Sequence, residues 1–289
     1  MFDSQNDPLR KSMPSWVILQ EAAIQVWVRR EHFGKLMLLP IVATVIVSYF
    51  QNLWDQPQTE EQPLVQIFVE AIFWIIPYGI ISALFAIVIH RSILLDERTS
   101  SSRWIIRLGK REIIFTGWSF LIGGGVWGIV TIGAALIGVL AGSFNLLYSD
   151  LFSRMEETHP WLENIVQTIV IALSGFTIGF LVSYFSARTS LILPAIALDR
   201  RQNLEWAWTI SKPHTMRLAV LVGVIPIASF LFQTLGSIWI SELLWEPAFE
   251  VLSAFVYCFL LMLEITVLSL SYRWITDSAS TTQPPTIAA

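Results

Sequence analysis

Long stretches without charged residues constrain this chain more than any other feature. No Asp, Glu, Lys or Arg occurs in residues 113–149, 164–187 or 218–241. Six apolar stretches reach the roughly 17–25 residues of a membrane span, and they lie at approximately 36–54, 64–89, 113–141, 164–187, 218–240 and 249–272. We therefore predict an all-α fold, a polytopic membrane helix bundle of six transmembrane helices in one domain (36–274), with amphipathic helices at its cytoplasmic face.

The overall composition excludes an ordinary soluble domain. Hydrophobic residues make up 54% of the 289 residues and charged residues 14%, whereas soluble domains average about 45–50% and about 25%. Aromatic residues, at 13%, suit a protein whose helix ends are anchored at membrane interfaces. The expected partner is the lipid bilayer, and no feature indicates nucleic acid.

Lysine and arginine gather on one side of the predicted spans. All 18 of them except Arg154 fall in the N-terminal leader, in the second and fourth links, or in the tail. Short loops rich in these residues stay in the cytoplasm. We therefore expect both termini to be cytoplasmic.

The cytoplasmic segments are predicted to contain short helices. Within the leader 1–35, polar residues in 16–33 recur at intervals of three or four and so share one helical face; they are Glu21, Gln25, Arg29 and His32. Two positions are open for this helix: flat on the inner leaflet, or packed on the bundle's own cytoplasmic face. Residues 275–289 are expected to form a disordered tail.

Small-residue spacings indicate where helices pack closely. Pairs of glycines four residues apart let two helix backbones approach; these are Gly124/Gly128, Gly138/Gly142 and Gly175/Gly179. Tight packing inside the bundle is the first interpretation. A flexible or broken third helix that moves during transport is the alternative.

Two acidic residues fall inside predicted spans. Glu264 lies near the middle of the membrane and Glu70 about two turns from the outer side. A carboxylate at that depth is costly, so it faces the bundle interior, finds a partner or is protonated. Both are candidate functional residues, with a neutral packing role as the alternative.

Basic residues of the cytoplasmic segments are candidates for contacts to anionic lipid headgroups. They are Arg91, Arg103, Arg107, Arg188, Arg200 and Arg201. Topology determination alone also explains their positions, and both interpretations stay open.

Signatures of soluble enzymes are missing. The chain has no phosphate-binding glycine loop, dinucleotide fingerprint, zinc-protease motif or serine-nucleophile elbow. Its four histidines lack metal-ligand spacing, and Cys258 is the only cysteine. We expect no catalytic, metal or cofactor site.

Three short runs resemble a known family. They are His90–Glu97, the pair Arg111-Glu112 with Phe115, and Ala187–Asp199 followed by Trp208-Thr209. They resemble an uncharacterised family of bacterial six-span inner-membrane proteins, which is distantly similar to the membrane domain appended to some glycerophosphodiester phosphodiesterases. The resemblance implies a fold and an inner-membrane location, without an activity.

These observations favour a non-enzymatic role: a permease-like protein, or a membrane factor that interacts with lipid, with a protein partner or with a second copy of itself. The alternatives are a membrane enzyme acting on lipid headgroups at the cytoplasmic face, and a structural subunit of a membrane complex.

Overall fold

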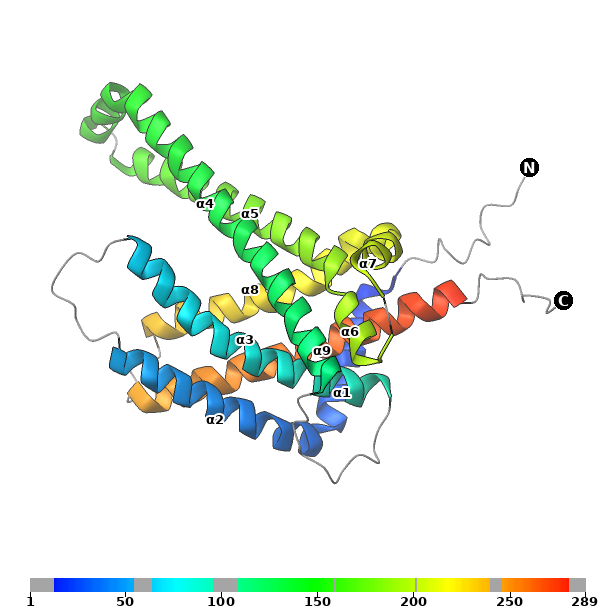
Figure 1. The fold of residues 1–289 in the computed structure, drawn as a ribbon. Helices are drawn as coiled ribbons and strands as arrows, with labels where there is room; N and C mark the ends of the chain where they lie inside the picture. The colour runs from blue at the N-terminus through cyan, green and yellow to red at the C-terminus, as the bar shows by residue number, and fades with distance from the viewer. Residues whose placement is uncertain are drawn as a thin grey trace, which may run out of the picture.

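The computed structural model describes residues 13–54, 64–95, 109–158, 160–200, 202–239 and 246–280. Every regular element in these ranges is helical, which confirms the all-α class for this part of the chain. The long helices are α2 (Arg30–Trp54), α3 (Leu64–Leu94), α4 (Lys110–Thr158), α5 (Pro160–Thr189), α8 (Thr215–Trp239) and α9 (Glu246–Ser280) (Figure 1). The short elements are α1 (Ser15–Val28), α6 (Ile192–Ala197), α7 (Leu204–Ser211) and the 3-10 turn η2 (Lys212–His214).

Each predicted span falls within one long helix, except that residue 240 of the fifth lies outside the described residues, and most helices are longer than the spans. The 49 residues of α4 measure about 74 Å at 1.5 Å per residue, against a hydrocarbon core of about 30 Å. α2 begins at Arg30, and α9 continues through Ser280, so the first residues of the predicted disordered tail are helical. The physical reason is that a span ends at the first charges, whereas a helix continues as long as its backbone hydrogen bonds are made.

Several helices are compatible with a membrane protein. Among the described residues, five segments are long and apolar enough to cross a membrane: Arg30–Gln51, Ile75–Leu94, Lys110–Val139, Gly175–Ala197 and Ala248–Ser278. The helix α8, which holds the predicted fifth span, is not one of the five.

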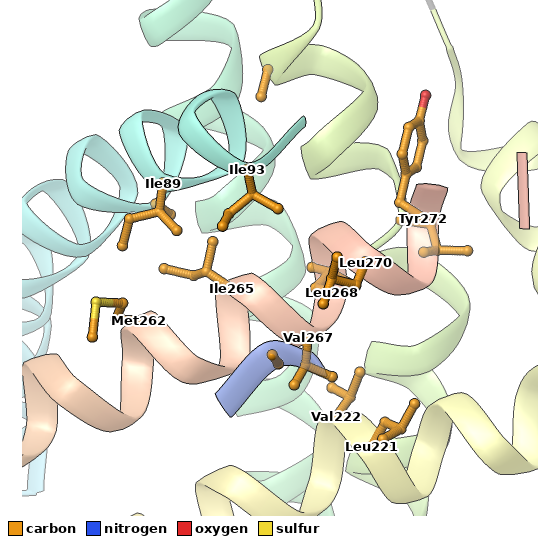
Figure 2. Close-up of a cluster of buried hydrophobic side chains, with 14 of the residues drawn as sticks. Ile89, Ile93, Leu221, Val222, Met262, Ile265, Val267, Leu268, Leu270 and Tyr272 are labelled. Atoms are coloured by element: carbon orange, nitrogen blue, oxygen red, sulfur yellow. The ribbon is translucent and has the colours of Figure 1, made fainter. Parts of the chain in front are cut away.

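The central element is α9, which packs against α1, α2, α3 and α8. Residues 265–272 in its C-terminal half are all buried. Figure 2 shows Ile89 of α3 pointing toward Ile265, and Val222 of α8 pointing toward Val267 from another side. Because lipid is as apolar as these side chains, their close packing contributes dispersion energy rather than a hydrophobic drive.

The short helix α1 packs on the bundle and does not run on into α2. Its buried face consists of Ile18, Ala22 and Val26, and it contacts α9 and α8. A turn at Arg29 ends the helix. The predicted helix over 16–33 is therefore divided at Arg29 between α1 and the first turn of α2. Trp16 and Trp27 are 67% and 70% exposed.

The close helix contacts involve other glycines than the predicted ones. A Cβ atom would meet nothing within 4 Å at five of the six predicted positions, which are Gly124, Gly128, Gly138, Gly175 and Gly179; the surroundings of Gly142 lie outside the described residues. An added Cβ would instead lie within 3 Å of a side chain on a neighbouring helix at Gly79, Gly125, Gly133 and Gly223. The spacing identifies a glycine-rich helix correctly but not the face that meets its neighbour.

Candidate functional site

A polar pocket lies between α2, α3 and α9. Its volume is about 370 Å³, within the roughly 300–1,000 Å³ of pockets that hold small molecules. The lining residues are Thr44, Val45 and Ser48 of α2, Tyr78 of α3, and Phe249, Glu250, Ser253, Ala254 and Tyr257 of α9. Hydroxyl groups and a carboxylate therefore face one another inside an otherwise apolar set of helices. We call this the α2–α3–α9 pocket.

Glu250 provides the carboxylate of this pocket. Ser48 Oγ donates a 2.7 Å hydrogen bond to Glu250 Oε2, and the phenol of Tyr78 interacts with Ser48 in turn. The ion pairs of Arg91 and Arg111 in the described ranges lie elsewhere, with Asp199 and Glu112 as partners. Within those ranges the charge of Glu250 is met by hydroxyl dipoles and not by a cation.

Tyr257 and Thr44 line the same pocket beside Glu250. Tyr257 Oη and Ser82 Oγ lie 2.9 Å apart and share a hydrogen bond. Thr44 is only 8% exposed, and its Oγ1 makes no hydrogen bond with a described nitrogen or oxygen. The neighbouring thiol of Cys258 is a weak partner. Since a buried hydroxyl without a good partner costs about 1–3 kcal/mol, Thr44 is available to a molecule in the pocket.

Polar side chains recur every seven residues along α9, starting in this pocket. They are Glu250, Tyr257, Glu264 and Ser271. Seven residues are about two turns, so these side chains share a face and follow one another at about 10 Å. Glu264 makes no hydrogen bond or ion pair with a described residue, and the buried Ser271 Oγ has no partner there either. Depth alone identifies Glu264 in the sequence, whereas the seven-residue spacing identifies this whole polar line.

The other end of the assembly, which we call the arginine end, consists of Arg29, Arg91, Arg111, Arg188, Arg200, Arg217 and Arg273 with the helix termini around them. Main-chain carbonyls of distant segments accept hydrogen bonds from four of these arginines: Ser92 from Arg29, Ala197 from Arg91, Met13 from Arg217 and Ile93 from Arg273. The last carbonyls of a helix have no partner within the helix. Guanidinium groups donate to such carbonyls here. The end of α3 is held by Arg29, which follows α1, and by Arg273 of α9; the end of α6 is held by Arg91 of α3.

Asp199 is the acidic partner at the arginine end. It adopts a φ of 59°, a left-handed conformation that Asp tolerates better than most residues. The backbone N–H groups of Asp199 and Arg200 donate to the carbonyls of Ile196 and Ala195, which closes α6 in a Schellman motif. The Asp199 carboxylate lies 3.0 Å from Arg111 and 3.6 Å from Arg91. The acid is therefore paired with cations of this chain.

The arginines predicted to contact lipid headgroups differ from one another in their surroundings. Arg188 is 5% exposed, with its guanidinium 4.4 Å from the Trp208 ring and donating to Thr215. Arg188, one of the predicted headgroup contacts, is therefore buried between α5, α7 and α8. Arg91 is bound to α6, while Arg200 is exposed. Arg103, Arg107 and Arg201, and the side chain of Glu70, lie outside the described residues.

In the described part of the chain, no group of three or more His, Cys, Asp or Glu residues is arranged to hold a metal ion. No protein-family model, curated protein or solved structure matches this chain. What bears on function is therefore the geometry of the α2–α3–α9 pocket, of the polar line and of the arginine end.

Proposed function

We propose that the chain is a six-span protein of a bacterial inner membrane, with both termini cytoplasmic, and that it is permease-like: it moves a small polar solute through the α2–α3–α9 pocket. The spans would be α2, α3, α4, α5, α8 and α9. Three observations favour α8 as a span. It has 25 residues, it contains no acidic or basic residue after Arg217, and it packs along α5 and α9.

The orientation is supported by the arginine end. The positive-inside rule assigns an end so rich in arginine to the cytoplasm. The same assignment makes α1, α6 and α7 cytoplasmic-face helices, and it agrees with the resemblance to bacterial six-span inner-membrane proteins.

The polar line of α9 is the observation that carries the permease proposal. Polar and ionisable groups inside a membrane are expensive, and they mark solute and ion pathways. Here they follow one face of the central helix, from an open pocket at Glu250 to the buried Ser271. A helix serving only to pack the bundle gains nothing from Glu264, which has no described partner.

There are three alternatives to the permease. The chain could bind lipid, a protein partner or a second copy of itself; it could be an enzyme that acts on lipid headgroups; or it could be a structural subunit of a membrane complex. The described arginines mostly bind parts of this same chain, so the arginine end gives none of these alternatives an observation of its own.

Cysteine labelling tests the proposal without knowledge of the solute. Cys258→Ala gives a cysteine-free background, because Cys258 is the only cysteine. A permease exposes its pocket to both faces in turn, so Ser253→Cys should react with an impermeant maleimide added to intact cells and also to inside-out vesicles. Ser101→Cys, in the predicted cytoplasmic link, should react only in inside-out vesicles.

Two results would contradict the proposal. Reaction of Ser253→Cys from one face only would exclude alternating exposure of the pocket. Reaction of Ser101→Cys in intact cells would reverse the orientation, because the surrounding link carries six arginines and lysines.

A further inference from the structure

We infer that the α2–α3–α9 pocket binds a small organic ammonium ion, such as an amine in its protonated form or a quaternary ammonium compound. This inference rests on the proposed function only in taking the pocket to be open to a solute. It adds the chemical class of the solute, which the proposed function leaves open.

The charge of the pocket selects a cation. Glu250 lies in the lining, and in the described ranges no arginine, lysine or histidine pairs with it. Its hydrogen bond from Ser48 occupies one carboxylate oxygen, Oε2, which leaves acceptor capacity for a further donor. An anion in the same place would face an uncompensated carboxylate at short range.

The rings of the pocket select an organic cation. Tyr78, Tyr257 and Phe249 line it together with Glu250, and aromatic faces attract ammonium groups by about 0.5–2 kcal/mol each. A combination of aromatic rings with a carboxylate is how proteins hold alkylammonium groups. The hydroxyl of Thr44, which lacks a good partner, is left for a polar substituent of the same molecule.

The volume argues against a bare metal ion. The pocket of about 370 Å³ equals about twelve water molecules at ~30 Å³ each. A hard cation needs six or more oxygens at about 2.0–2.6 Å, a spacing that residues on three helices around so wide a space do not provide. An organic cation of several carbon atoms fills the same space.

Binding to the purified full-length chain in lipid nanodiscs tests the inference. The probes are choline chloride, ethylammonium chloride, and 3,3-dimethylbutan-1-ol, which replaces the choline nitrogen by carbon and so removes its charge. Sodium chloride at equal ionic strength is the salt control. We expect at least one ammonium probe to bind and to raise the melting temperature, and the neutral alcohol to bind about tenfold or more weakly.

Variants assign the binding to the pocket. Glu250→Gln keeps the shape and the acceptor for Ser48 but removes the charge, and it should weaken ammonium binding about tenfold or more. The matched control is Glu205→Gln on α7, an exposed carboxylate outside the pocket, which should bind as the parent does. Tyr78→Phe should retain binding and Tyr78→Leu should lose it, so the assignment stays testable if Glu250→Gln does not fold.

The outcomes separate this inference from the proposed function. No binding of either ammonium ion, or equal binding of the neutral alcohol, overturns the ammonium site even if Ser253→Cys is labelled from both faces. Ammonium binding that depends on Glu250, with labelling from one face only, supports the site and overturns the permease.

Discussion

The two ends of the helix assembly treat charge in opposite ways. At the arginine end, Asp199 pairs with Arg91 and Arg111, and other guanidinium groups hold helix-terminal carbonyls. In the α2–α3–α9 pocket, the described residues meet Glu250 with a hydroxyl and not with a cation, and among them Thr44 lacks a good partner. Charge that is satisfied internally stabilises the fold, whereas charge left open at a pocket is available to a ligand. The comparison supports a structural role for the arginine end and the proposed binding role for the pocket.

The largest expected effect is a loss of labelling when the polar line, which leads from the pocket toward the arginine end, is interrupted. Glu264→Leu should interrupt this line, so that Ser253→Cys is no longer labelled from the cytoplasmic face, while the melting temperature stays the same or rises. The reason is that Glu264 has no described hydrogen bond to lose, and an apolar side chain removes a desolvation cost. Glu264→Gln keeps a polar group of the same shape and should preserve labelling. Two-face labelling in the Leu variant would refute a role for the line.

The arginine end should respond in stability and not in binding. Arg273→Ala leaves the Ile93 carbonyl without its donor, and it should cost about 1.5–3 kcal/mol, read as a lower melting temperature in detergent. Arg30→Ala is the matched control, because Arg30 is exposed and bonds only within its own neighbourhood; it should stay within about 0.5 kcal/mol. If Arg273→Ala lost ammonium binding without a change in melting temperature, the result would contradict the assignment of a purely structural role to the arginine end.

A pair of glycine variants tests the packing near the arginine end. In Gly223→Ala the new Cβ would lie 2.5 Å from Ser183 Oγ and 3.2 Å from its Cβ, and we expect a loss of about 1 kcal/mol from overpacking. Gly124→Ala meets open space and should gain up to about 1 kcal/mol through helix propensity. Equal melting temperatures in the two variants would contradict the observed contact face.

The smallest effect concerns pH. Burial, followed by the charge of Arg217, lowers the pKa of His214 below its ordinary 6.5. Between the pKa of His214 in the folded chain and about 6.5, the unfolded chain therefore binds more protons than the folded one. The free energy of unfolding falls as pH falls from about 6.5 through the folded pKa. His214→Gln should reduce the drop in melting temperature between pH 7.5 and 5. An unchanged drop would mean that His214 titrates alike in both states.

The sequence predicts the helices better than their contacts. Long apolar runs that contain few charges mark the six long helices, because a membrane span admits few charges. The structure adds that Asn203 caps α7, where its side-chain oxygen accepts a hydrogen bond from the Trp206 N–H. The break at Arg29 is different, since no residue there marks a helix end in the sequence, and the Arg29 side chain bonds to the distant Ser92 carbonyl. Likewise, glycine spacing in α4 cannot say that Gly125, and not Gly124, meets Phe185.

Only the α9 residues of the candidate site can be identified from the sequence. Glu264 stands out because it is a charge in an apolar run, and the spacing to Glu250 and Tyr257 is present in the sequence as well. The pocket itself is not, because it requires α2 and α3 to bring Ser48 and Tyr78 to the same place as Glu250. Residues far apart in the chain become neighbours only through the pairing of these helices.

Counterflow of labelled choline in proteoliposomes is the most direct test of the central claim. The account predicts that liposomes with the purified chain, preloaded with unlabelled choline, take up labelled choline faster than protein-free liposomes, and that Glu250→Gln and Glu264→Leu abolish the difference while Arg30→Ala does not. Uptake equal to that of protein-free liposomes, by protein that binds choline in nanodiscs, would contradict it.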